Sequence, residues 1–363
     1  MIFLSRTTNT PGSRGLAARC LTLGFIALLA LAGCTQTAQS NGGKGANFGD
    51  QKNHIHAMVT LPGHPGTLLV GTHYGLFRTT DGGQTWKKLL GDPGQLAEHL
   101  MDQYLAVSPV NAERVYLEGI SFPDLPTPTG TPGVYTSPDG GVTWKLALAL
   151  SSLPSQTVYY LVAGAQSEQQ LYAYFPQKQD KGLYESLDGG ATWQPLGTLP
   201  DTESLGLLVD PAKPGHLFMY SANGLFESAD NGTTWQSAPG IKDGIQQAAL
   251  SGSTVYATGD DGTFVSQDDG GQFRLVAPGQ TFQYLVSSPE NPNTVYGLGA
   301  STMDVSTDAG KTWSSLVLPP DRLLAAHLVI DPASSADVYL GNSYPVTIYS
   351  TSNSGQNWSQ IAP

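Results

Sequence analysis

The chain is poor in cysteine, in basic residues and in long apolar segments, and each shortage narrows what the protein can be. Its 363 residues include only two cysteines, Cys20 and Cys34. Cys20 lies in an N-terminal segment that we expect to be removed, so the remaining chain cannot form an internal disulfide. The fold must therefore rest on packing and hydrogen bonds alone.

Basic residues are outnumbered by acidic ones. Lys and Arg total 17 against 29 Asp and Glu, which gives a formal net charge of −12. Residues 1–33 contain three arginines and no acid, so without them the balance becomes 14 − 29 = −15. An acidic domain is repelled by nucleic acid and by anionic lipid head groups, so neither is expected as a direct partner.

The longest apolar segment, Leu21 to Leu31, is too short to cross a membrane as a permanent helix. It follows three arginines and ends in Leu31-Ala32-Gly33-Cys34, which predicts a cleaved signal peptide over residues 1–33. The tetrapeptide resembles the bacterial lipobox. That resemblance implies that Cys34 is lipidated, and that the protein is an extracytoplasmic, membrane-anchored lipoprotein of the bacterial cell envelope. The alternative is an ordinary signal with an incidental cysteine.

Residues 34–52 are polar and rich in glycine, without apolar periodicity. This composition is typical of a flexible tether, here one that holds the domain off the membrane. The folded part is expected to be a single domain over residues 53–363, because repeats continue through the whole of it.

What the chain has in abundance is one repeated motif, Ser/Thr-x-Asp-x-Gly-x-Thr-Trp. The full motif occurs at residues 79–86, 137–144, 186–193, 228–235 and 306–313, and weaker copies occur at 266–273 and 351–358. All six tryptophans close a copy of it. Repeats at a period of about 40 residues mark an architecture in which each unit supplies one sheet of a ring or array.

The residue types of the motif fit a tight turn between two strands. The Asp accepts N–H bonds within its own turn, the Gly provides a positive φ, and the Trp opens the next strand and is buried between sheets. We therefore assign a structural role to these positions, and a calcium site at Asp268 and Asp269 is disfavoured because no further spaced ligands follow. The structural Asp-box residues are Asp81, Trp86, Asp139, Trp144, Asp188, Trp193, Asp230, Trp235, Asp268, Phe273, Asp308, Trp313, Asn353 and Trp358.

Four short strands can be assigned within each repeat, with the motif between the third and the fourth. Seven such units predict an all-β fold, a seven-bladed β-propeller with four antiparallel strands per blade. Each blade is expected to come from one continuous segment. Ring closure then depends on packing between blades seven and one.

These repeats resemble the Asp-box, or BNR, repeats of sialidases, sortilin-type receptors, some glycoside hydrolases and photosystem II assembly-factor propellers. The resemblance covers essentially all of residues 53–363 and implies the propeller fold. It does not choose between enzymes and binders, because both use this repeat. We expect a ligand, a protein partner or a glycan to bind on the loop-rich face, with a carbohydrate-active glycoside hydrolase as the alternative.

Sialidase activity is disfavoured by the scarcity of arginine. The resemblance to those enzymes would imply three arginines around the substrate carboxylate, and after residue 33 the chain has only Arg78, Arg114, Arg274 and Arg322. Arg78 and Arg274 lie beside motif turns, away from the expected ligand face, and two arginines cannot form the clamp. A glycosidase that works with two carboxylates stays open, since it needs only a pair about 5–10 Å apart.

Histidines gather at the end of the ring opposite the motif turns. His54 and His56 are two apart on the first strand, about 7 Å along it, and His73 is expected opposite His54 in the next strand. Three such imidazoles could bind zinc or copper, and the alternative is that they serve as hydrogen-bonding residues at a strand end. The candidate metal or ligand residues are His54, His56, His73, Glu98, His99, Asp102 and His327. Two insertions, 122–132 and 176–181, fall at the same end, where binding loops are common.

Overall fold

The computed structural model describes residues 48–122, 125, 127–153, 160–175, 182–201, 204–319, 326–344 and 346–362. The predicted signal peptide, Cys34 and the tether up to residue 47 lie outside the described residues, as do 123, 124 and 126 of the first insertion and the whole of 176–181. Within the described ranges, no helix is long and apolar enough to cross a membrane.

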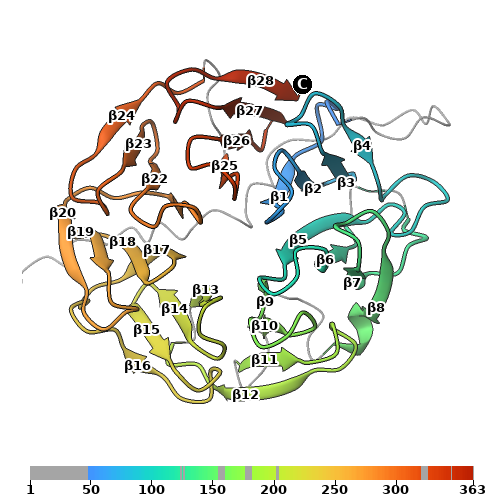
Figure 1. Ribbon diagram of the computed structural model, residues 1–363. Coiled ribbons are helices and arrows are strands. Elements are labelled where there is room, and N and C mark those ends of the chain that lie inside the picture. Colours follow the sequence, from blue (N-terminus) through green and yellow to red (C-terminus); the bar gives the residue numbers. More distant parts are fainter. Residues whose placement is uncertain are drawn as a thin grey trace, which may run out of the picture. The chain divides into compact units, whose positions relative to one another are not determined.

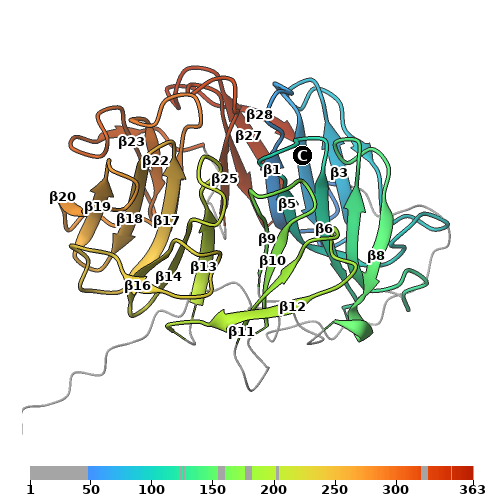
Figure 2. The same cartoon turned by 60° about the horizontal axis from the view of Figure 1, so that its bottom comes forward.

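In these described ranges, twenty-eight strands form seven separate four-stranded antiparallel sheets arranged in a ring (Figure 1). In each sheet, strands pair in chain order, with the first near the centre of the ring and the fourth at its rim. Figure 2, a tilted view, shows the sheets standing side by side as blades. The predicted all-β seven-bladed propeller is confirmed, and each blade is one continuous segment.

Each repeat contributes four short strands, as predicted. Blades one and two contain β1 (Ile55–Thr60), β2 (Leu68–Thr72), β3 (Gly75–Thr79), β4 (Lys87–Lys88), β5 (Met101–Val107), β6 (Val115–Ile120), β7 (Gly133–Ser137) and β8 (Lys145–Ala149), followed by the 3-10 turn η1 (Leu150–Ser152). Blades three and four contain β9 (Tyr160–Ala163), β10 (Leu171–Phe175), β11 (Gly182–Ser186), β12 (Gln194–Thr198), β13 (Ser204–Val209), β14 (Leu217–Ser221), β15 (Gly224–Ser228) and β16 (Gln236–Ser237). Blade five contains β17 (Ile245–Ser251), β18 (Thr254–Gly259), β19 (Gly262–Ser266) and β20 (Arg274–Pro278). Blades six and seven contain β21 (Tyr284–Ser287), β22 (Val295–Leu298), β23 (Met303–Ser306), β24 (Ser314–Leu316), β25 (Ala326–Ile330), β26 (Val338–Asn342), β27 (Thr347–Thr351) and β28 (Ser359–Ala362).

The motif turn of blade two shows how the repeat works. Asp139 accepts hydrogen bonds from the Ser137 hydroxyl at 2.9 Å, the Thr143 amide at 2.7 Å and the Thr143 hydroxyl at 2.6 Å. Burial of the turn raises the pKa of Asp139, but these bonds outweigh burial and hold the pKa below its ordinary value. Trp144 closes the turn by donating Nε1–H to the carbonyl of Gly141 at 2.8 Å.

Gly141 also joins blade two to blade one. Its φ is +84°, and a Cβ there would lie 2.9 Å from Cδ1 of Leu69 in β2. Both the backbone conformation and the close approach therefore require glycine. Within blade two, the amide of Gly140 donates to the carbonyl of Glu113 in the β5–β6 turn at 2.8 Å. Motif turns and first-to-second-strand turns thus share one end of the ring, and the loops between second and third strands lie at the other.

Blades seven and one close the ring without sharing a strand. Thr60 donates its hydroxyl to the carbonyl of Ile330 at 3.0 Å, and the amide of Gly66 donates to Oδ2 of Asp331 at 2.8 Å. A buried apolar cluster at the same seam contains side chains from both blades. It contains Phe48, Ile55, Met58, Leu68, Val70, Phe77, Tyr339, Val346, Ile348 and Ala362.

Phe48 belongs to this seam although the sequence places it in the tether. Its ring is 8% exposed and stacks on Phe77 with centroids 4.2 Å apart, and Trp86 lies 4.9 Å away. The side-chain amide of Asn53 donates to the carbonyl of Phe48 at 3.0 Å. Phe48 therefore packs onto the propeller, and the polar composition of the segment around it does not reveal this contact.

Candidate functional site

A β-bulge in the first strand brings His56 close to its two histidine neighbours. In the β1–β2 pairing Ile55 lies opposite Thr72 and Ala57 opposite Gly71, so His56 is the extra residue of the bulge. Bulges bend the strand locally and redirect a side chain. At the end of the same pair, the amide of His73 donates to the carbonyl of His54 at 3.0 Å, which is the predicted opposition of these two residues.

The three imidazoles converge on one point. The ring of His54 lies 4.7 Å from that of His73 and 4.4 Å from that of His56, centroid to centroid. One nitrogen from each ring can be chosen so that all three lie within 4.8 Å of one another. His73 is 4% exposed, whereas His54 and His56 are half-buried. Two aromatic rings, of Tyr74 and Phe122, face the edge of the His73 ring at 5.1 and 5.2 Å.

Hydrogen bonds orient two of these rings and leave a buried nitrogen on the third. The Lys52 carbonyl lies 3.3 Å from Nδ1 of His54, which fixes that nitrogen as a donor. Nδ1 of His73 lies 3.3 Å from Sδ of Met101, the first residue of β5. Nε2 of His56 is buried and has no hydrogen-bond partner among the described residues.

Burial favours the neutral form of His54 and His56. It lowers the pKa of His54, an effect that the Lys52 carbonyl partly offsets. It lowers the pKa of His56 well below its ordinary value, and the charges of His54, His73 and His327 lower it further. At neutral pH, therefore, the imidazoles of His54 and His56 present lone pairs rather than positive charges.

His327 reaches the group from blade seven. Its Nε2 donates to the carbonyl of Ile55 at 3.2 Å, and the Ser343 hydroxyl donates to the same oxygen at 3.1 Å. Burial lowers the pKa of His327 to about 4, with the Ile55 bond opposing the shift. His327 thus borders the three histidines and is tied to the backbone beside the bulge.

The acidic candidates do not join the three histidines. Among the described residues, the group of converging ligand atoms contains His54, His56 and His73 alone. Glu98 accepts from the amide of Gly94 at 3.0 Å, and Nδ1 of His99 lies 3.4 Å from the carbonyl of Thr127. Gly94 in the same loop thus binds Glu98, and Thr127 in the β6–β7 insertion binds His99, which sequence spacing could not show.

Asp102 is instead buried between blades one and two. A Cβ on Gly71 would lie 3.1 Å from Cβ of Asp102, so the carboxyl group packs over a glycine of β2. Neither carboxyl oxygen has a hydrogen-bond partner among the described residues. Burial raises the pKa of Asp102 well above its ordinary value, and the charge of Lys88 opposes this only in part.

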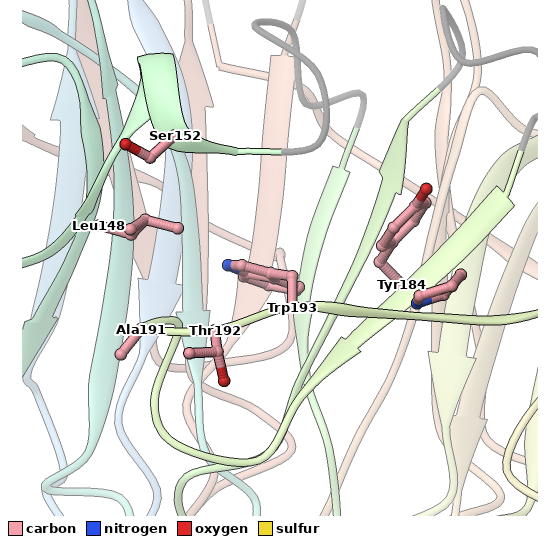
Figure 3. A pocket seen from close by; sticks show the side chains of 7 residues that line it. Leu148, Ser152, Tyr184, Ala191, Thr192 and Trp193 are labelled. Atoms are coloured by element: carbon pink, nitrogen blue, oxygen red, sulfur yellow. The ribbon is translucent and has the colours of Figure 1, made fainter.

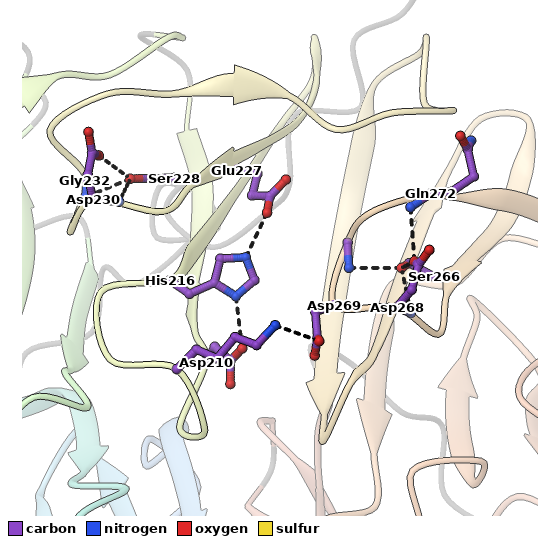
Figure 4. Close-up of polar contacts among 12 residues, drawn as sticks. Asp210, His216, Glu227, Ser228, Asp230, Gly232, Ser266, Asp268, Asp269 and Gln272 are labelled. Carbon is purple, nitrogen blue, oxygen red and sulfur yellow. Dashed lines mark hydrogen bonds and ion pairs between the residues drawn. The ribbon is translucent and has the colours of Figure 1, made fainter.

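A buried polar network in blade four was not predicted (Figure 4). Nδ1 of His216 lies 2.9 Å from Oδ2 of Asp210, and Nε2 lies 2.9 Å from Oε1 of Glu227, so both ring nitrogens meet carboxylates. Beside it, Lys213 contacts Asp269 of blade five at 2.6 Å. Phe218 pairs with Glu227, so Glu227 lies diagonally opposite His216 on the neighbouring strand. The alternation of side chains along the two strands could have predicted that these two residues are neighbours. With no ring nitrogen left over, His216 is a structural residue.

One exposed pair of carboxyl groups occurs on the loop-rich face at blade five. Asp243 precedes β17 and Asp261 lies in the β18–β19 turn. Interaction with the neighbouring carboxyl group of Asp243, and its charge, raise the pKa of Asp261. A carboxyl group whose pKa is raised by a second carboxyl group is a property that acid–base sites use.

A pocket of about 500 Å³ opens at the rim between blades two and three (Figure 3). It contains none of the candidate residues and no charged side chain, and the Thr192 hydroxyl within it is already bonded to Asp188 at 2.6 Å. We assign no chemistry to it. The lining residues are Leu148, Ser152, Tyr184, Ala191, Thr192, Trp193 and Pro195.

Comparison with known proteins supports the Asp-box propeller. The family model for the BNR/Asp-box repeat matches residues 77–88, the first copy of the motif. A search of curated proteins finds no match. Solved structures match at low identity, which establishes similarity of fold alone.

A GH74 xyloglucanase from Xanthomonas campestris matches with a TM-score of 0.64 at 17% identity, over 86% of this chain and 55% of the enzyme. A YCF48 protein bound to a D1 peptide matches with a TM-score of 0.58 at 16% identity, over 83% of this chain and 92% of that protein. YCF48 from Cyanidioschyzon merolae matches with a TM-score of 0.59 at 14% identity, over 83% and 96%. The chain therefore spans about half the length of the xyloglucanase and nearly all of the YCF48 propellers.

Proposed function

We propose that this protein is a lipid-anchored, extracytoplasmic propeller that binds a polypeptide segment on its loop-rich face. The anchor follows from the lipobox-like sequence at Cys34. We favour binding over catalysis because the match covers more of the YCF48 protein than of the xyloglucanase, and because acidic side chains are exposed on the loop-rich face.

The observation that carries this proposal is the extent of the match to YCF48. The match covers 92% of the YCF48 protein that is bound to a D1 peptide, so the similarity extends over nearly all of that peptide-bound chain. In the present chain the blades are continuous and the seam is bonded, which gives a rigid frame for loops. Peptide binding on such a frame is therefore the simplest use of it.

Charge indicates which polypeptides would bind. Asp243, Asp260 and Asp261 are exposed together on the loop-rich face at blade five, with Lys242 as the nearby cation in sequence. Elsewhere Lys88 and Arg114 are paired with Asp92 and Glu168. An acidic surface attracts cationic segments and raises their rate of association. We therefore expect a Lys- or Arg-containing segment.

The alternative is a carbohydrate-active glycoside hydrolase. It is favoured by the fold shared with the xyloglucanase and by the carboxyl pair Asp243 and Asp261, in which Asp243 raises the pKa of Asp261. Against it, nearly half of that enzyme has no counterpart in this chain. In a hydrolase, one member of the pair would donate a proton to the leaving group and the other would act as base or nucleophile.

A paired screen separates the two functions. The protein is tested against a glycan panel with product detection, and against a peptide array that contains cationic segments and charge-neutralised versions of each. Retention of cationic peptides without sugar release supports the proposal. Sugar release that disappears in Asp243→Asn and Asp261→Asn would replace it with the hydrolase, and retention of glycans alone would make the protein a glycan binder.

A further inference from the structure

We infer that His54, His56 and His73 form a binding site for a copper or zinc ion. The inference is independent of peptide binding and of the lipid anchor. It rests on the convergence of the three rings, on the orientation of their nitrogens and on the donor types around them.

The spacing of the nitrogens suits a single ion. Ring nitrogens bind zinc at about 2.0–2.1 Å, so two ligands of one tetrahedral ion lie roughly 3.3–3.5 Å apart. The three selected nitrogens lie within 4.8 Å of one another. The separations exceed those of ligands on one ion by at most about 1.5 Å, so binding would draw the rings of half-buried His54 and His56 closer together.

The hydrogen bond of His54 matches those of metal-binding histidines. Such residues usually donate one ring N–H to a carbonyl or carboxylate and present the other nitrogen to the metal. His54 does so through Nδ1 and the carbonyl of Lys52 at 3.3 Å. His56 contributes the second observation, a buried Nε2 with no described partner. Left without a ligand, a buried polar atom of this kind costs free energy.

The donor set favours copper over zinc and disfavours hard cations. Among the residues that the structure describes, no carboxylate joins the converging atoms, and this disfavours calcium and magnesium, which require oxygen ligands. Imidazoles suit both copper and zinc, and divalent copper binds nitrogen sites more tightly.

The experiment titrates untagged protein with copper sulfate and with zinc chloride, in separate calorimetric runs. Wild type should bind one ion per chain, with copper tighter than zinc. His54→Gln/His56→Gln should weaken binding by at least about tenfold, because even the outer partners of metal ligands contribute about 10- to 100-fold. Nitrogen hyperfine structure in the copper EPR spectrum should report imidazole ligation in wild type and be lost in the variant.

The matched control is His64→Gln. His64 lies in the β1–β2 turn at the other end of the same hairpin, pairs with Glu113 at 2.8 Å and is 41% exposed. It should leave metal binding unchanged. Equal affinity in wild type and in His54→Gln/His56→Gln, or an equal loss in His64→Gln, would overturn the site.

Two further measurements test whether the variants fold and whether peptide binding depends on the metal. Circular dichroism of each variant checks that the propeller has formed, and the single variant His54→Gln, at a half-buried position, supplies the comparison if the double variant does not fold. Peptide binding is measured with and without EDTA, so failure of the metal site and failure of the proposed function give different results.

Discussion

Trp86 donates its Nε1–H to the carbonyl of Ile361 at 2.9 Å, across the seam between the first and the last blade. Four other motif tryptophans donate to a glycine of their own turn, and Trp358 donates to the carbonyl of Val317 in blade six. The first tryptophan thus holds the last strand, 275 residues away. The same seam is covered by Phe48 and borders the histidine group, so closure and the candidate site share a part of the ring.

Phe48→Ala should destabilise the domain by about 3 kcal/mol, because it removes a buried aromatic ring and leaves a cavity over Phe77. Urea unfolding followed by tryptophan fluorescence measures the effect. Deletion of residues 35–46 is the control and should change stability by less than about 0.5 kcal/mol. If the deletion were as harmful as the substitution, the tether would contribute to the fold.

Asp139→Asn should cost about 1 kcal/mol and Asp139→Ala about 2 kcal/mol, since a typical hydrogen bond contributes about 0.5–1.5 kcal/mol. Blade seven shows why Asn is tolerated: Asn353 accepts from the Thr351 hydroxyl at 2.8 Å and from the Asn357 amide at 3.0 Å. Thermal unfolding of both variants provides the comparison. A larger loss for Asn than for Ala would contradict the turn-bonding role.

The Asp102→Asn variant should become more stable relative to the wild-type protein as pH rises. The pKa of Asp102 is higher in the folded protein than its ordinary value of 3.8, which applies to the unfolded chain. The contribution of this group to the free energy of unfolding is therefore fully present below pH 3.8 and is lost as pH rises toward the folded pKa. The nearby titratable groups are Lys88 and Tyr135. Urea unfolding at about pH 4 and pH 8 measures the trend, and a difference that did not change with pH would argue against it.

His216→Leu should cost about 3 kcal/mol or more, because it leaves Asp210 and Glu227 without their shared partner in a buried position. His64→Leu removes an imidazole from a half-exposed pair with Glu113 and should cost less than about 1 kcal/mol. Unfolding of the two variants under one condition tests the contrast. Equal losses would mean that burial of the blade-four network is unimportant.

Cys34→Ala should move the protein from the membrane fraction to the soluble fraction and abolish labelling by a radioactive fatty acid, since the acidic domain has little affinity of its own for lipid head groups. Fractionation of cells that express both forms measures this. Continued labelling of the variant would refute lipidation at Cys34.

The sequence by itself determined the fold. Seven copies of one turn motif, each followed by an aromatic residue, specify seven strand-to-strand turns because Asp, Gly and Trp act within a few residues of one another. The opposition of His54 and His73 was equally predictable, since hairpin register follows from the turn between two short strands.

Only the tertiary structure decided which residues meet across blades. Burial of Phe48 on Phe77, isolation of Asp102 over Gly71 and exclusion of Glu98 from the histidine group depend on how neighbouring sheets pack. The bulge at His56 is an irregularity of one strand, and it sets the distance between rings. Local motifs fix turns because their partners are close in the sequence, whereas a site between blades is fixed by contacts that sequence spacing does not encode.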